Sequence, residues 1–181
     1  MRGISRFSRP RHGLLVALAA STLLGVGVSA SSATTPAGGS FKVWATPTTA
    51  GARSLVIAGA IGDYGSAVTI DQNGTTDAKG NYSHVLLQKG TFRINLTAFN
   101  KAAGKASFPI NKANCSSEGS ITAPASVSNG TGLYKGISGN VHLTLTLVWI
   151  VPRNSDNKCD GTKKALFHSE YLTGTGTVSF S

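Results

Sequence analysis

Two titratable residues near the C-terminus have the types and the spacing of an acid–base pair. His168 and Glu170 are two residues apart in "ALFHSEYL" (165–172), and residues at that spacing in a β-strand point to the same face. A carboxylate beside an imidazole orients the ring, and such a pair can move a proton to or from a substrate. Leucines on the same face favour an inward orientation, whereas aromatic residues on the opposite face favour an outward one. Both orientations therefore stay open.

A second candidate acid lies in the first half of the chain. Asp63 and Tyr64 belong to "GDYG" (62–65), which separates two apolar segments. An acid and a phenol at the mouth of a pocket can protonate or orient a substrate oxygen. The alternative is that Asp63 stabilises a tight turn and that Tyr64 packs at the rim of the fold.

Four further residues are candidate ligand contacts: Arg93, Tyr134, His142 and Trp149. Arg93 and His142 alternate with apolar residues, so they lie on the outer surface unless the apolar faces meet another subunit and turn them inward. The histidines of the chain lack the close spacing of a zinc site. We therefore expect no metal and no cofactor.

The first 33 residues of the 181-residue chain have the composition of a secretory signal peptide. Four arginines and no acid precede an apolar run over residues 14–28, and small residues follow it. The run is short for a membrane span of about 20 residues, although a retained single-span anchor is the alternative. We expect cleavage after Ala30 or Ala33, a flexible leader over 34–41, and one exported domain over 42–181.

The chain is basic, with 17 Lys and Arg against 7 Asp and Glu and a formal net charge of +10. Loss of the four arginines in the predicted signal peptide lowers this charge to +6. The remaining cations are spread singly, apart from the pair Lys163–Lys164. A nucleic-acid site needs basic residues clustered with aromatic ones, so we expect no nucleic-acid partner. We expect instead a weak attraction to anionic envelope polymers or lipid headgroups.

The chain contains two cysteines, Cys115 and Cys159. An even number of cysteines in an exported protein predicts a disulfide. The bond would close a loop of about 45 residues, which the chain-entropy description values at about 4 kcal/mol. A thiol nucleophile is the alternative, and no feature of the sequence favours it.

Short runs rich in β-forming residues fill the predicted domain. We predict eight strands, at 41–46, 53–60, 66–71, 82–88, 91–99, 119–127, 139–151 and 165–180. No segment has the pattern of an amphipathic helix, and 106–110 is ambiguous because Pro109 has no N–H for a strand ladder. Strands of this kind, separated by Gly, Asn and Asp turns, are typical of an all-β sandwich or barrel.

Glycines surround the longest of these predicted strands. Residues 139–151 would span about 40 Å at about 3.3 Å per residue, which suits a strongly coiled sheet. Glycine tolerates unusual backbone angles and leaves room for a neighbouring strand at a barrel corner. We assign this role to Gly130, Gly132, Gly136, Gly139, Gly174 and Gly176. The predicted fold class is all-β, an eight-stranded antiparallel β-barrel, because closure also removes exposed sheet edges.

Two of the glycine motifs are similar to those of a known family. "GTGLYKGISGNVHL" (130–143) resembles a turn-and-strand signature shared by allene oxide cyclases and dirigent proteins, and "GDYGSAVTI" (62–70) resembles the start of a strand in allene oxide cyclases. Together with the secretory leader, these motifs are most similar to bacterial exported proteins with such a barrel. The resemblance implies an apolar pocket at one end of the barrel and a homotrimer as the common assembly.

The resemblance also implies a function that involves small hydrophobic molecules. Allene oxide cyclases rearrange a fatty-acid epoxide with help from a carboxylate on an early strand, and dirigent proteins position phenolic radicals or quinone methides. The first two predicted strands contain no acid, so we favour a secreted barrel that binds a small lipid-derived or phenolic ligand without turnover.

Three alternatives stay open. The first is an isomerase or cyclase that acts on such a ligand, and the second is a structural module of the cell envelope with a filled barrel. The third is an OB-type barrel that binds single-stranded nucleic acid, which the strand number and the scattered charge disfavour.

Overall fold

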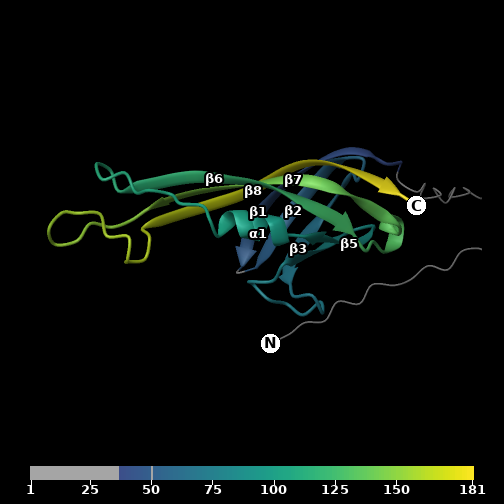
Figure 1. Cartoon of the computed structure of the whole chain (residues 1–181), viewed down its shortest axis with the longest axis horizontal. Coiled ribbons are helices and arrows are strands. Elements are labelled where there is room, and N and C mark those ends of the chain that lie inside the picture. The colour runs from purple at the N-terminus through teal and green to yellow at the C-terminus, as the bar shows by residue number, and fades with distance from the viewer. Residues whose placement is uncertain (1–36, 50) are drawn as a thin grey trace, which may run out of the picture. The chain divides into compact units, whose positions relative to one another are not determined.

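The computed structural model describes residues 37–49 and 51–181, which form eight strands and two short helices (Figure 1). The elements are β1 (Gly39–Thr49), β2 (Ala52–Gly59), β3 (Asp63–Ile70), β4 (Tyr82–Leu87), β5 (Gly90–Asn95), α1 (Thr97–Ala103), β6 (Ser116–Ser128), η1 (Gly132–Tyr134), β7 (Ile137–Ile150) and β8 (Phe167–Phe180). The predicted signal peptide, with its cleavage sites after Ala30 or Ala33, lies outside the described residues.

The strands pair antiparallel in chain order and close into a barrel. Closure occurs where β8 returns to β1, with residues 39–45 opposite residues 178–172. The predicted eight-stranded antiparallel β-barrel is confirmed. Residues 39–41, at the end of the predicted leader, already belong to β1 and pair with β8.

The fifth strand is shorter than predicted, and a helix follows it. The prediction of a strand over 91–99 is wrong beyond Asn95, where β5 ends. The Asn95 side chain accepts a hydrogen bond from the Thr97 N–H at 2.9 Å, and this local turn competes with the strand ladder. The prediction that no helix is present is also wrong, because α1 begins at Thr97 and buries Phe99. With only seven residues, α1 is too short to show a clear helical periodicity.

Neither helix is long. α1 has seven residues and η1 has three. Across the described residues, no helix combines the length and the apolar composition needed to span a bilayer.

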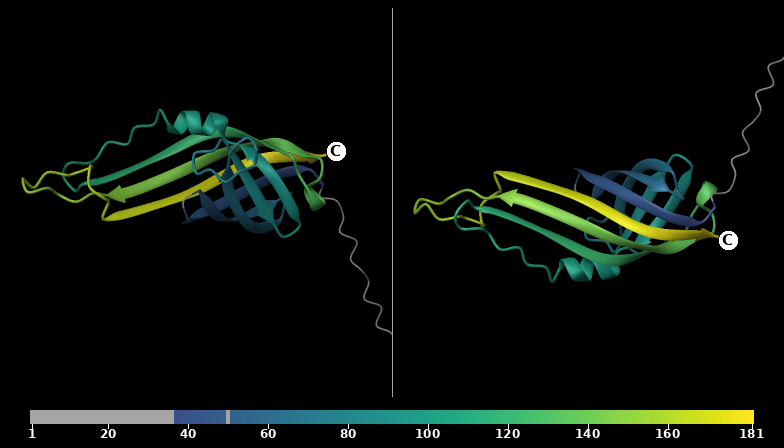
Figure 2. Two further views of the ribbon diagram at one scale, coloured as in Figure 1. Left: turned by 90° about the horizontal axis from the view of Figure 1, so that it is seen from below. Right: turned by 90° about the horizontal axis from the view of Figure 1, so that it is seen from above.

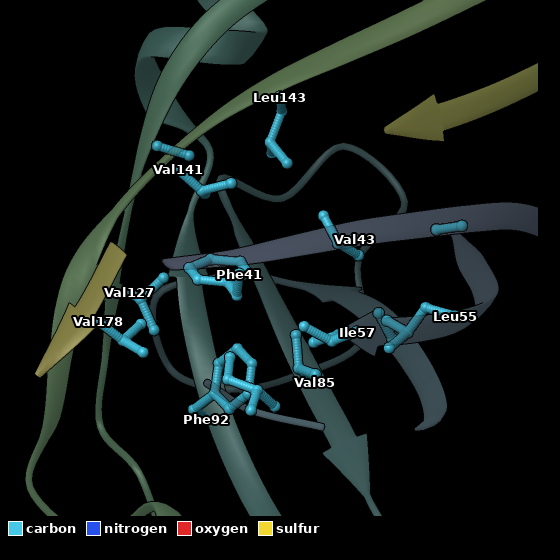
Figure 3. Close-up of a cluster of buried hydrophobic side chains, with 14 of the residues drawn as sticks. Phe41, Val43, Leu55, Ile57, Val85, Phe92, Val127, Val141, Leu143 and Val178 are labelled. Carbon is cyan, nitrogen blue, oxygen red and sulfur yellow. The ribbon is translucent and has the colours of Figure 1, made fainter. Parts of the chain in front are cut away.

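Alternate residues of the strands point into the barrel and build one apolar core (Figure 3). Val85, Phe92, Val141 and Leu143 are each exposed by 1% or less. Full burial of such a side chain stabilises a fold by about 1.5–3 kcal/mol. In β7 the buried Val141 and Leu143 alternate with the exposed His142, as the sequence predicts.

Glycines serve the long strands in two ways. Gly139 of β7 and Gly176 of β8 lie so close to the neighbouring strand that a Cβ at either would overlap a carbonyl oxygen, of Thr177 and of Asn140 respectively. Gly132 has a φ of +59° in the connection between β6 and β7, a conformation that glycine adopts without strain. Close strand approach and a tight connection therefore both depend on glycine.

The last three strands extend past the rest of the barrel (Figure 2). β8 pairs with β1 only as far as Leu172, whereas β6, β7 and β8 stay paired with one another to their distal ends. We call this extension, residues 116–120, 146–150 and 167–171, the arm.

The crossover from α1 to β6 covers one face of the arm. Phe108 packs edge-to-face against Trp149, with ring centroids 5.8 Å apart, and fills the space left by Gly119. The Ser117 hydroxyl donates to the Phe108 carbonyl oxygen at 3.0 Å. Residues 106–110, which were ambiguous in the sequence, therefore form this cover and not a strand.

The predicted disulfide is present and ties the distal end of the arm together. Cys115 and Cys159 are bonded, with their Cα atoms 5.2 Å apart. Neither cysteine is free, so the alternative of a thiol nucleophile is wrong. Disulfides persist where the environment is not reducing.

Candidate functional site

The two ends of the barrel are built from different connections. The Asp63 end comprises the β2–β3 turn (60–62), the β4–β5 turn (88–89) and the β6–β7 connection (129–136). The Arg53 end comprises the β1–β2 turn, the β3–β4 connection (71–81) and α1. The arm extends beyond the Arg53 end.

Asp63 is held inside the Asp63 end. Asp63 is only 6% exposed, and Tyr134 beside it is fully buried. The Tyr134 hydroxyl donates to Asp63 Oδ2 at 2.6 Å. The backbone N–H groups of Tyr64 and Lys89 donate to the same carboxylate at 2.8 and 3.0 Å. Three donors within the protein therefore satisfy this carboxylate.

These contacts shift both pKa values away from neutrality. Burial alone would raise the pKa of Asp63, but the hydrogen bonds from Tyr134 and from the two backbone N–H groups outweigh it and lower the pKa. Burial, and then the bond to the Asp63 carboxylate, raise the pKa of Tyr134. The carboxylate therefore stays charged and the phenol stays protonated across the physiological range, which suits a structural contact.

The structure pairs Asp63 with Tyr134 and not with Tyr64. Tyr64 is 62% exposed and points to the outer wall of the barrel. Tyr134, a predicted ligand contact, has its hydroxyl engaged by Asp63.

A cleft of about 820 Å³ opens at the Arg53 end. Its apolar lining residues include Leu96, Phe99, Ala103, Leu143, Leu145 and Leu172. Its polar lining residues include Arg53, Thr69, Lys79, Asn81, Asn100, His168 and Glu170. Sites for small organic ligands occupy about 300–1,000 Å³, so the cleft has the size of such a site, with both apolar and polar residues in its lining.

A smaller space of about 60 Å³ continues from the cleft into the barrel core. The two spaces share several lining residues, among them Arg53, Leu143 and Leu172. A space of this size holds no more than a few water molecules. The barrel interior is therefore largely filled by side chains, and the cleft at its mouth has the room for a ligand.

Hydrogen bonds fix α1 to the β3–β4 connection, and both elements line the cleft. The Asn100 amide nitrogen donates to the Gly80 carbonyl oxygen at 3.1 Å and to Asn81 Oδ1 at 2.9 Å. The Leu96 N–H donates to the Asn81 carbonyl oxygen at 2.8 Å. This part of the cleft wall is therefore fixed by hydrogen bonds within the chain.

Among the described residues that line the cleft, Arg53 has a buried side-chain nitrogen without a hydrogen-bond acceptor. Its Nη2 donates to Glu170 Oε1 at 2.7 Å, in an ion pair whose side chains are 26% and 20% exposed. Its Nη1 is buried and has no hydrogen-bond acceptor in the part of the chain that the structure describes. A buried N–H without an acceptor is costly, so an acceptor that reached Nη1 would stabilise the guanidinium.

His168 and Glu170 both line the cleft. They lie on the face of β8 that continues the barrel interior, in line with Leu172. The hydrogen-bond partner of Glu170 is Arg53, however, and not the predicted His168. Glu170 therefore serves to hold the guanidinium in place at the cleft wall.

The remaining predicted contacts lie away from the cleft. Arg93 and His142 alternate with buried residues and point to the outer wall of the barrel. Trp149 lies in the arm beneath Phe108. None of these three residues lines the cleft. Within residues 37–49 and 51–181, no group of three or more His, Cys, Asp or Glu side chains is arranged to hold a metal ion.

Sequence reasoning missed Arg53 and Phe99 as parts of the site. Arg53 shares the inward face of β2 with Leu55 and Ile57, and a cation in line with core residues at the start of a strand indicates a charged group at a barrel mouth. Phe99 gives no such signal, because the seven residues of α1 are too few to show a helical periodicity.

Comparison of the chain with protein-family models, with curated proteins and with solved structures gives no match.

Proposed function

We propose that the protein binds a small, mainly apolar ligand in the cleft at the Arg53 end. The observation that carries this proposal is the buried Arg53 Nη1, which lacks an acceptor beside a cleft walled by leucines. A ligand oxygen that accepts from Nη1 would complete the guanidinium, and a hydrogen bond from a charged donor is among the stronger ones. The apolar part of the ligand would then contact Leu143 and Leu172.

The cleft also supports this function over that of a purely structural barrel. A filled barrel needs no cleft of about 820 Å³ at its mouth, and it gains nothing from an arginine with an unused donor. The ligand we propose is lipid-derived or phenolic in character, since both classes combine an apolar body with an oxygen acceptor. The resemblance to allene oxide cyclases and dirigent proteins, and the homotrimer that it implies, stay predictions.

The proposed place of action is outside the reducing cytoplasm. The bonded Cys115–Cys159 pair supports it, because disulfides are rare where thiols are kept reduced. The basic and apolar start of the chain also supports export.

A second candidate function, an isomerase or cyclase, is favoured by one observation. His168 and Glu170 line the same cleft, and an imidazole near a carboxylate can assist proton transfer. If the ligand recovered from the cleft is converted by the protein, Glu170→Gln should slow the conversion while the ligand still binds. Equal rates for the two proteins would exclude a role of Glu170 in the conversion, and a wild-type protein that does not convert the ligand would leave binding as the function.

The binding proposal is tested with protein recovered from the secretions of its own host. Native mass spectrometry would show a small molecule that travels with the protein and would give the number of subunits. Anilinonaphthalene sulfonate, which carries an apolar body and a sulfonate acceptor, serves as a defined probe by its fluorescence. Arg53→Met should weaken binding of the probe by about tenfold or more, because a charge-assisted hydrogen bond contributes about 1.5–3 kcal/mol.

Two further variants make this test specific. Leu172→Trp would fill the cleft and should also weaken binding. Lys42→Met removes a cation from the exposed outer wall of β1 and should leave binding unchanged. The proposal is wrong if no small molecule or probe binds, or if the Lys42 variant loses as much affinity as the Arg53 variant.

A further inference from the structure

The distal end of the arm exposes three apolar residues that are neighbours along the chain or in the strand register. Leu166 is 72% exposed, Phe167 is 54% exposed and Ile150 is 39% exposed. Ile150 and Phe167 lie opposite each other in the register of β7 and β8, and the Leu166 N–H donates to the Ile150 carbonyl oxygen at 2.8 Å. We call these three residues the tip cluster. Adjacent exposed apolar residues of this kind mark a contact surface more often than isolated ones do.

Covalent and hydrogen-bonded links fix the backbone beside the tip cluster. The disulfide joins Cys115 to the β7–β8 loop at Cys159, and the Val151 N–H donates to the Cys115 carbonyl oxygen at 3.0 Å. The Arg153 guanidinium donates to the carbonyl oxygens of Ala113 and Asn157, each at 2.7 Å. The backbone next to the tip cluster is therefore fixed by a disulfide and by hydrogen bonds.

The chain beside the tip cluster carries more cations than acids. Lys163 and Lys164, the only adjacent cations in the predicted exported domain, directly precede Ala165 and Leu166. The β7–β8 loop also carries Arg153 and Lys158, and its acids are Asp156 and Asp160. Glu118 is the acid on the outer face of the arm, opposite Val148. The tip thus combines a small excess of positive charge with exposed apolar side chains.

We infer that the tip of the arm docks on the surface of an anionic lipid bilayer. Leu166 and Phe167 enter the boundary between headgroups and acyl chains, and Lys163 and Lys164 contact headgroup phosphates. Apolar side chains next to lysines suit such a surface, because insertion and charge attraction act together. A second copy of this basic chain would bring like charges together, and an anionic polymer would leave the apolar side chains without a partner.

The inference is tested by co-sedimentation of the exported protein with lipid vesicles. Vesicles of phosphatidylglycerol mixed with phosphatidylcholine should bind it, and vesicles of phosphatidylcholine alone should bind it about tenfold less, because the lysines lose their partners. The double variant Leu166→Ser/Phe167→Ser and the double variant Lys163→Gln/Lys164→Gln should each weaken binding to the anionic vesicles by about tenfold. Added salt should weaken the wild-type protein further.

Matched variants on the barrel wall serve as controls. Val56→Ser removes an apolar side chain that is 48% exposed, and Lys42→Gln removes an exposed cation. Both should bind anionic vesicles as the wild type does, and near-ultraviolet circular dichroism should show that all variants are folded. The inference fails if the wild type does not bind anionic vesicles, or if the wall variants lose as much binding as the tip variants. It also fails if the Leu166/Phe167 variant changes the subunit number instead of vesicle binding.

Discussion

Each end of the barrel holds a charged side chain against the core, and the two ends satisfy that charge to different degrees. At the Asp63 end, the carboxylate accepts from Tyr134 and from two backbone N–H groups. At the Arg53 end, the guanidinium donates to Glu170, while its Nη1 is buried without an acceptor in the described part of the chain. The Asp63 carboxylate is satisfied within the chain, whereas the Arg53 guanidinium has a donor without an acceptor among the described residues, beside an open cleft.

This difference separates stability from function in physical terms. A buried polar group with all its partners stabilises the fold, because the loss of any partner leaves a desolvated charge. A group that lacks a partner lowers stability, and proteins keep such groups where a ligand supplies the missing contact. We therefore expect substitutions at the Asp63 end to change unfolding and substitutions at the Arg53 end to change binding.

The largest expected contrast comes from removing one aromatic side chain at each end. Tyr134→Ala should lower the free energy of unfolding by about 4 kcal/mol, because it leaves a cavity and removes a donor from Asp63. Phe99→Ala should cost only about 2 kcal/mol, since the space it leaves joins a cleft that is already open. Urea denaturation followed by tryptophan fluorescence measures both values. Equal losses would contradict the difference between the two ends.

Removal of the Tyr134 hydroxyl alone tests the hydrogen bond without the cavity. Tyr134→Phe should lower the free energy of unfolding by about 1.5–3 kcal/mol, the usual contribution of a hydrogen bond to a charged group. It should also raise the pKa of Asp63, because that bond lowers the pKa. Tyr82→Phe is a matched control on a partly exposed strand residue, for which we expect a smaller change. Nuclear magnetic resonance titration of the carboxyl carbon follows the pKa, and an unchanged value would show that the bond is not formed in solution.

The pH dependence of the free energy of unfolding should reveal the Asp63–Tyr134 pair at both acid and alkaline pH. The pKa of Asp63 is lowered in the folded state. Asp63 therefore contributes to the free energy of unfolding above about pH 4, its pKa in the unfolded chain, and this contribution is lost as the pH falls. The pKa of Tyr134 is raised in the folded state. Tyr134 therefore contributes to the free energy of unfolding below about pH 10, its pKa in the unfolded chain, and this contribution is lost as the pH rises.

Above pH 10 the wild type should therefore lose up to about 1.4 kcal/mol per pH unit more than Tyr134→Phe does, because one proton distinguishes the two states. Urea midpoints measured across this range for both proteins give the difference. Parallel curves for the two proteins would mean that the Tyr134 phenol titrates normally in the folded state.

The barrel could be predicted from the sequence because its signals are local and repeated. Alternation in stretches such as Phe92-Arg93-Ile94 defines which face is buried, and glycines such as Gly139 and Gly176 mark where strands approach closely. The disulfide could also be predicted, because the chain offers one possible pairing. These features depend on residue type and neighbours along the chain.

The site could be predicted only in part, because it depends on register between distant strands. His168 and Glu170 were recognised from their spacing, but the partner of Glu170 is Arg53, which is 117 residues away in the chain. Tyr134 meets Asp63 across 71 residues in the same way. Helix α1 was missed because the turn at Asn95 replaces the strand ladder within two residues. No local pattern specifies such contacts before the barrel closes.

The smallest expected effect on stability is at the Arg53–Glu170 ion pair, and it completes the comparison of the two ends. A double-mutant cycle of Arg53→Met and Glu170→Gln should give a coupling energy of about 0.5 kcal/mol, because both side chains are partly exposed and pairs of this kind contribute little. The matching cycle of Asp63→Asn and Tyr134→Phe should give a coupling energy of about 2 kcal/mol.

Arg53→Met alone should leave the free energy of unfolding nearly unchanged, since it removes an ion pair and an unpaired buried N–H together. The same variant should lose ligand binding, so a single side chain would contribute to function without contributing to stability. A coupling at Arg53–Glu170 as large as that at Asp63–Tyr134 would mean that both ends serve mainly to hold the barrel together.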